Sequence, residues 1–77
     1  MSKAKKDKIK PGKYQHYKGK YYKVLSLATH SESLEKLVVY QQLYGDYSIW
    51  VRPFEMFTEN IQVDNKTVKR FSFVSDK

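Results

Sequence analysis

The sequence predicts a mainly β fold: a small, partly open SH3-like barrel of five or six strands with one short helical turn. The chain has 77 residues, which is enough for a single core. Its body consists of short runs rich in tyrosine, valine and leucine, separated by tight turns that contain Gly, Asp or Asn. No segment is repeated, and a series of short strands of this kind favours a small barrel over a sandwich.

The first two runs predict a β-hairpin. Residues 13–17 and 20–28 are separated by Lys18-Gly19, a short turn of the kind that joins antiparallel strands. In the second run, strict alternation divides the side chains into two faces, and neither face is cleanly polar. These faces hold Tyr22, Val24, Ser26 and Ala28 on one side and Tyr21, Lys23, Leu25 and Leu27 on the other.

A second pair of strands follows a polar loop. Residues 29–35 are rich in turn-forming side chains and too few for an independent helix. Residues 36–44 form the third predicted strand, Gly45-Asp46 a reverse turn, and residues 48–52 the fourth strand. Pro53 ends this strand, because proline has no N–H to donate to a β-ladder.

The last part of the chain combines a helical turn with a final hairpin. Phe54-Glu55-Met56-Phe57 is predicted to be one turn whose apolar side chains close one end of the barrel. Residues 61–63 and 67–74 then form two strands around a turn at residues 64–66, where Asn65 suits a left-handed conformation.

The predicted core takes inward-facing apolar side chains from several elements. Its members are Val24, Leu37, Val39, Val51 and Phe57. If Val51 faces inward, alternation places Trp50 and Arg52 together on the opposite face of the fourth strand. There the pair forms a recognition patch, since Trp and Arg are frequent at interfaces. The alternative is that Trp50 is a large core residue and Arg52 bridges to a nearby carboxylate.

Composition narrows the function classes. The chain has no cysteine, which excludes disulfides, cysteine zinc sites and thiol chemistry. Aromatic residues make up 16% of the chain and supply the buried area that so small a domain needs. No apolar run is long enough to span a bilayer and no hydrophobic signal leads the chain, so we expect a cytoplasmic protein that binds no membrane.

The net charge of +7 is unevenly distributed. Residues 1–13 hold six Lys and one Asp, whereas the remainder holds nine basic and seven acidic side chains. We therefore expect a disordered, lysine-rich tail over residues 1–9, a single domain over residues 10–74 and a C-terminal tail over residues 75–77. The lysine-rich tail is either a solvated segment or an arm that contacts phosphates.

Six strings in the chain are distinctive. They are Pro11-Gly12-x-Tyr14-x-His16-Tyr17-x-Gly19, His30-Ser31-Glu32-x-Leu34-Glu35, Val38-Val39-Tyr40, Leu43-Tyr44-Gly45, Trp50-Val51-Arg52-Pro53 and Met56-Phe57. In this order, the chain from about Pro11 to Phe71 resembles the bacterial family called domain of unknown function 1653. The resemblance implies a small SH3-type β-barrel and no established activity. The lysine tail lies outside the family pattern, and Asn65-Lys66 stands where a glycine turn is usual.

The two histidines make neither a metal site nor a catalytic group in our interpretation. A zinc site needs about three protein ligands, and His16, His30 and Glu32 match no metal signature. His30-Ser31-Glu32 contains a base, a hydroxyl and a carboxylate, but adjacent residues rarely reach the geometry of a catalytic triad. We expect a loop network there instead, with no catalytic residue, metal or cofactor.

The predicted binding site is one aromatic and polar groove. It is formed by Tyr14, His16, His30, Glu32, Tyr40, Trp50 and Arg52. Seven tyrosines are too many for so small a core, and exposed rings beside basic groups suit peptides as well as single-stranded nucleic acid. We predict a non-catalytic binding module for a protein or peptide, with nucleic acid as the second choice and a small enzyme as the third. Alternatively, the same residues form an internal hydrogen-bond network that stiffens the barrel.

Overall fold

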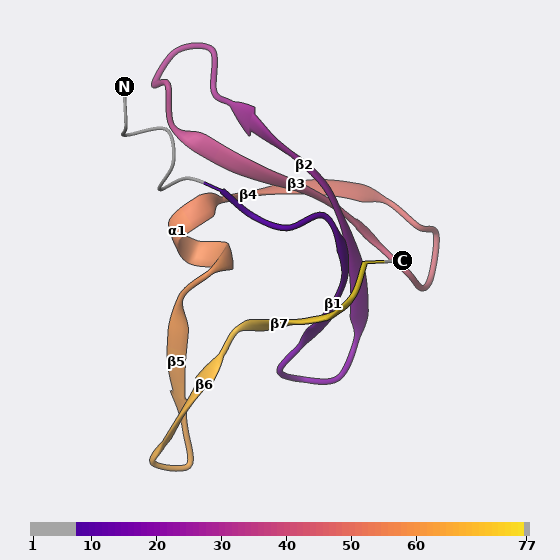
Figure 1. Cartoon of the computed structure of the whole chain (residues 1–77), viewed down its shortest axis with the longest axis vertical. Helices are drawn as coiled ribbons and strands as arrows, with labels where there is room; N and C mark the ends of the chain where they lie inside the picture. Colours follow the sequence, from indigo (N-terminus) through magenta and orange to yellow (C-terminus); the bar gives the residue numbers. More distant parts are fainter. Residues whose placement is uncertain (1–7, 77) are drawn as a thin grey trace.

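The computed structural model describes residues 8–76, which form seven strands and one short helix. The elements are β1 (Gly12–His16), β2 (Tyr21–Thr29), β3 (Lys36–Gln42), β4 (Ile49–Pro53), α1 (Phe54–Phe57), β5 (Asn60–Val63), β6 (Lys66–Lys69) and β7 (Phe71–Ser75) (Figure 1). This arrangement confirms the mainly β class with one helical turn.

Five of these strands form one antiparallel sheet in the order β4-β3-β2-β1-β7, while β5 and β6 pair as a separate hairpin. The large sheet curls without closing, and the β5–β6 hairpin projects away from it (Figure 1). The prediction of a partly open barrel therefore holds.

The strand count is higher than predicted because the segment over residues 67–74 breaks at Arg70. The Arg70 N–H donates to the Glu59 carbonyl at 3.1 Å, and the Arg70 carbonyl accepts from the Tyr17 N–H at 2.9 Å. These bonds join the start of β7 to β1 and the end of β6 to the segment after α1. The single strand predicted over residues 67–74 is therefore two strands, β6 and β7, which belong to different sheets.

The core lies on one face of the large sheet, which we call the inner face. Its buried side chains are Tyr14, Val24, Val38, Tyr40, Phe57 and Phe71. Phe57 enters from α1 and is 1% exposed, so the helical turn closes the core as predicted. Its ring stacks on that of Phe71 from β7, with centroids 4.0 Å apart.

The prediction of a buried core residue is confirmed for Val24 and Phe57 and is wrong for Val51. Leu37 and Val39 are half-buried. Val51 is 56% exposed, because the β3 residues that face inward are Val38 and Tyr40. Val39 pairs with Val51 in the register, and this pair faces outward. Residues 37–40 are apolar on both faces, so alternation alone does not decide which face is buried.

A β-bulge overturns the strict alternation predicted for β2. The register between β2 and β3 shifts between Val24 and Ser26. After the bulge Leu27 pairs with Val38 and packs against the core, whereas Leu25 is exposed. The extra residue reverses the faces along the second half of the strand.

Residues 1–7 and 77 lie outside the described residues, so most of the predicted lysine-rich tail over residues 1–9 does as well. Ile9 packs against the core, and the Lys10 carbonyl accepts a hydrogen bond from the Tyr14 hydroxyl at 2.7 Å. The packed part of the chain thus includes Ile9. Within residues 8–76 no helix is long and apolar enough to cross a membrane, and the cytoplasmic location stays a prediction.

Candidate binding site

Trp50 and Arg52 lie on the inner face of β4, beside the core. In the register Trp50 pairs with Tyr40 and Arg52 with Val38, and both partners are buried. Trp50 itself is 52% exposed, because β4 is the last strand of the sheet and the indole lies beyond the covered part of the core. Alternation correctly predicts that this pair shares a face, although the face is the inner one.

The Arg52 guanidinium lies among rings and has no acidic partner among residues 8–76. Its Nε lies 3.5 Å from the Tyr40 hydroxyl, and its Cζ is 5.8 Å from the centroid of the Phe71 ring. The ion pair in the described part of the chain joins Arg70 to Glu59. A guanidinium carries five N–H donors, so most of the hydrogen-bonding capacity of Arg52 is left to solvent or a ligand.

Three tyrosines form a contiguous ladder next to Arg52. The Tyr22 ring packs edge to face against Tyr40 and Tyr44, with centroids 5.6 Å apart in each case. The Tyr22 and Tyr44 hydroxyl groups lie 2.6 Å apart and share a hydrogen bond. Burial, followed by this bond, raises the pKa of Tyr22 to about 12, so the Tyr22 hydroxyl is uncharged at neutral pH.

His16 borders the ladder from β1. Its ring lies 4.8 Å from Phe71 and 6.4 Å from Tyr22, centroid to centroid. Burial lowers the pKa of His16 below its ordinary value, and the charges of Arg70, Arg52 and Lys18 lower it further. Three cationic side chains thus lie close enough to His16 to disfavour its protonated form. We call His16, Tyr22, Tyr40, Tyr44, Trp50 and Arg52 the Arg52 site. Tyr40 is a buried core residue and is included because its hydroxyl lies beside Arg52.

A polar turn holds Trp50 in place. Its Nε1–H donates to Gln42 Oε1 at 2.7 Å, and Gln42 Nε2 in turn contacts Asp46 Oδ1 at 3.3 Å. Asp46 also accepts from the Ser48 hydroxyl at 2.6 Å, and this bond lowers the pKa of the Asp46 carboxyl. The β3–β4 turn thus orients the indole at the rim of the Arg52 site.

Tyr14 belongs to the core rather than to the site. It is 7% exposed, and its ring contacts Phe57 and Phe73 at 5.6 and 5.4 Å. Burial raises the pKa of its hydroxyl, which bonds to the backbone carbonyl of Lys10. The structure therefore places Tyr14 outside the Arg52 site, against Phe57 of α1 and Phe73 of β7, where it lines a separate hollow.

His30 and Glu32 lie in the β2–β3 loop, at the opposite end of β2 from Tyr22. His30 Nδ1 accepts hydrogen bonds from the Glu32 and Ser33 N–H groups at 3.1 and 3.2 Å, so it holds the β2–β3 loop. The nine residues of β2 separate this loop from Tyr22 by roughly 25–30 Å at about 3.3 Å per residue, whereas Arg52 pairs with Val38 and Val38 with Leu27, three residues before His30. His30 and Glu32 therefore lie far from the tyrosine at the other end of β2, and we do not include their loop in the Arg52 site.

Sequence reasoning missed Tyr22, Tyr44 and Gln42 as members or supports of the site. Tyr22 pairs with Gln42 across β2 and β3, and Tyr44 follows directly in the turn. The signal was the concentration of tyrosines in these two strands, but their common face depends on a register that the sequence does not show. No group of three metal-ligating side chains occurs within residues 8–76.

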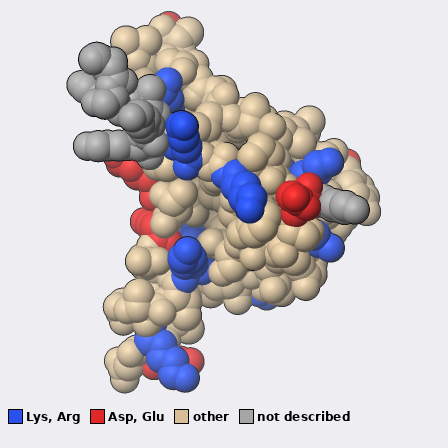
Figure 2. All heavy atoms as spheres, in the orientation of Figure 1, with Lys and Arg blue, Asp and Glu red and all other residues tan. Residues whose placement is uncertain are grey.

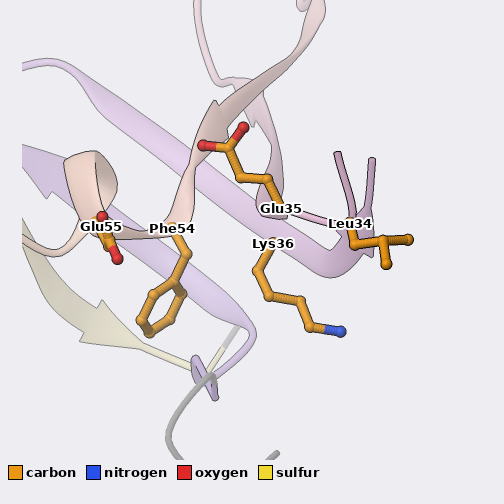
Figure 3. A pocket seen from close by; sticks show the side chains of 5 residues that line it. All are labelled: Leu34, Glu35, Lys36, Phe54 and Glu55. Atoms are coloured by element: carbon orange, nitrogen blue, oxygen red, sulfur yellow. The ribbon is translucent and has the colours of Figure 1, made fainter. Parts of the chain in front are cut away.

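Two hollows lie outside the Arg52 site. One has a volume of about 350 Å³ between the β2–β3 loop and α1, where Leu34 and Phe54 stand beside Glu35, Lys36 and Glu55 (Figure 3). The other, of about 220 Å³, has an aromatic floor with lysines at its rim and is lined by Lys8, Ile9, Lys10, Tyr14, Phe57, Thr58, Lys69, Phe71 and Phe73. Neither lining includes Trp50 or Arg52.

Fold and site define a small, open β domain with an aromatic and cationic surface. The family of proteins of unknown function DUF1653 matches residues 12–73, and the chain belongs to this family. A crystal structure of a DUF1653 protein from Bordetella bronchiseptica is similar, with a TM-score of 0.82 and 32% identity, covering 90% of this chain and 91% of that one. No curated protein matches the chain. The resemblance inferred from the sequence is confirmed.

Proposed function

We propose that this domain is a non-catalytic binding module that recognises an acidic protein segment through the Arg52 site. The observation that carries the proposal is the position of the Arg52 guanidinium among tyrosine and phenylalanine rings without a carboxylate partner within residues 8–76. An arginine of this kind is a strong, geometrically specific receptor for a carboxylate.

The form of the site supports an extended ligand. Trp50 is 52% exposed beside Arg52, and Trp and Arg are the side chains that most often dominate protein interfaces. Neither of the two hollows described above includes Arg52 in its lining. Trp50 and Arg52 follow each other on one face of β4, an arrangement that suits an extended segment lying along the strand. We assign no catalytic role to His30, because its Nδ1 holds the β2–β3 loop.

Single-stranded nucleic acid is the second candidate, and the first hairpin favours it. Lys13 lies 4.6 Å from the Tyr21 ring and Lys18 lies 5.9 Å from the Tyr17 ring, and both tyrosines are 39% exposed. Exposed rings beside lysines can stack bases and contact phosphates. On the face seen in Figure 2, however, the Lys and Arg side chains of residues 8–76 occur in separate places and form no continuous basic track.

A displayed library of random peptides, selected on the immobilised full chain, tests the proposal. We expect enrichment of Asp- and Glu-containing sequences on the wild type and loss of this enrichment on Arg52→Gln. Lys66→Gln is the matched control, because it removes one positive charge from the exposed β5–β6 hairpin. Equal enrichment on all three proteins would overturn the proposal. Binding of an oligonucleotide that Lys18→Gln weakens, with no peptide selected, would favour the second candidate.

A further inference from the structure

β4 forms an open edge of the large sheet. It lies at one end of the strand order and pairs only with β3 within residues 8–76. Its first three residues are among the most exposed apolar side chains, with Ile49 at 60%, Trp50 at 52% and Val51 at 56%. An exposed strand at a sheet edge offers unpaired backbone groups to another chain.

The hydrogen-bond register identifies which backbone groups face outward. The Gln42 N–H donates to the Ser48 carbonyl at 3.0 Å, so these two residues form a hydrogen-bonded pair at the start of the β3–β4 ladder. Bonded and non-bonded pairs alternate in an antiparallel ladder. Trp50 and Arg52 therefore bond to β3, whereas the N–H and C=O groups of Ile49 and Val51 face the open edge. Within residues 8–76 nothing hydrogen-bonds to these four groups.

The side chains of β4 differ between its two faces. Trp50 and Arg52 lie on the inner face, and Ile49 and Val51 lie on the outer face with Val39 beside them. In a strand added next to β4, successive side chains would alternate between these two surroundings. Residues beside Arg52 would meet a cation, and residues beside Ile49 and Val51 would meet an apolar surface.

We propose that the acidic partner binds as an additional β-strand along the open edge of β4, with acidic residues toward Arg52 alternating with apolar residues toward Ile49 and Val51. This inference rests on the proposed function and adds its binding mode. The backbone groups of Ile49 and Val51 supply main-chain affinity, and the two faces supply sequence selectivity. Pro53, which has no N–H, limits the pairing to a short stretch.

Charge favours an acidic partner over a second copy of this chain. The chain carries a net charge of +7, of which residues 14–77 carry +2, so two copies have the same sign of charge and an acidic partner has the opposite one. Pairing of β4 with itself would bring no carboxylate to Arg52, since β4 contains none. An acidic strand satisfies the backbone edge and the guanidinium together.

Amide hydrogen exchange of the full chain tests this mode, with an acetylated and amidated heptapeptide of alternating Glu and Val as the probe. At a peptide concentration ten times its Kd, we expect the exchange of the Ile49 and Val51 amides to slow roughly tenfold. The Trp50 and Arg52 amides, already bonded to β3, serve as internal controls. A peptide of alternating Lys and Val controls for strand propensity without the acidic charge.

Two N-methylated versions of the Glu and Val peptide separate strand pairing from charge attraction. Methylation of alternate amides blocks one edge of the peptide, so one version should lose roughly tenfold or more in affinity while the other binds normally. Binding weakened by Arg52→Gln but unaffected by either methylation, without protection of Ile49 and Val51, would overturn strand addition and leave the proposed function standing.

The remaining outcomes also decide the question. If the Glu and Val peptide pairs with β4 equally well in the wild type and in Arg52→Gln, recognition of acidic residues by Arg52 is contradicted, and with it the proposed function. Protection of Ile49 and Val51 that rises with protein concentration in the absence of peptide would identify a second copy as the occupant. No binding of the Glu and Val peptide at millimolar concentration would overturn the inference.

Discussion

The rings of Phe57 and Phe71 stack with centroids 4.0 Å apart and planes inclined by only 5°. Phe57 comes from α1 and Phe71 from the start of β7, so this contact fastens the helical turn to the edge strand opposite β4. Both side chains are almost fully buried. The inner face on which Arg52 lies is thus built around this pair.

Replacement of Phe57 by alanine should lower the free energy of unfolding by about 3–5 kcal/mol, because a large buried ring is replaced by a cavity. Urea denaturation measures the loss. Met56→Ala in the same turn is the control, since Met56 is 45% exposed and its replacement should cost less than about 0.5 kcal/mol. Similar losses for the two variants would mean that α1 does not close the core.

Val24 and Val51 differ in burial and should differ in energetic weight. Val24 is 1% exposed and Val51 is 56% exposed. Val24→Ala should therefore destabilise the domain by about 1–3 kcal/mol, while Val51→Ala should change its stability by less than about 0.5 kcal/mol. The comparison of melting temperatures checks that Val24 faces the core and that Val51 faces outward. A larger loss of stability for Val51→Ala than for Val24→Ala would refute both orientations.

Gly12 cannot accept a side chain without movement of the chain. Its φ is +138°, and an added Cβ would lie 2.5 Å from the Ser75 carbonyl oxygen. Gly12→Ala should cost more than about 1 kcal/mol, measured by thermal unfolding. Gly19→Ala is the control for backbone conformation alone, because Gly19 has φ +111° but open space around it. The smaller loss is expected at Gly19, and equal losses would mean that the contact with Ser75 contributes nothing.

The stability of the domain should fall as pH decreases through the titration of His16. Burial and the charges of Arg70, Arg52 and Lys18 hold the folded-state pKa of His16 below its ordinary value of 6.5. The unfolded chain therefore binds more protons between these two pKa values, and the free energy of unfolding rises with pH across that window.

His16→Gln should reduce this pH slope, which denaturation at several pH values would measure. The pKa of the neighbouring Tyr22 hydroxyl is raised to about 12, so Tyr22 does not titrate in this window. Wild type and variant with the same slope would contradict the positive environment of His16.

The sequence was sufficient to predict most elements but not their faces. Gly19, Gly45 and Asn65 mark turns by their conformational freedom, and all three have positive φ in the structure. Which face of β3 is buried was not predictable, because residues 37–40 place apolar side chains on both faces of the strand. The bulge between Val24 and Ser26 leaves no sequence signature, yet it decides that Leu27 faces the core.

The candidate site was predictable only where neighbours in sequence are neighbours in space. Trp50 and Arg52 share a face because they are two residues apart in one strand. The prediction that His30 and Glu32 lie in the same groove as these residues depends on where the β2–β3 loop lies along the sheet, which the local sequence does not show. The two ends of β2 separate that loop from His16, a distance set by pairing register rather than by local sequence.

The fluorescence of Trp50 reports directly on acidic recognition at the Arg52 site, because Trp50 is the chain's single tryptophan and belongs to this site. The peptide of alternating Glu and Val is titrated into the wild type, Arg52→Gln and Lys66→Gln. The account predicts a saturable change in emission for the wild type and Lys66→Gln, and an affinity weaker by roughly tenfold or more for Arg52→Gln. Unchanged emission in the wild type, or one affinity shared by all three proteins, would contradict it.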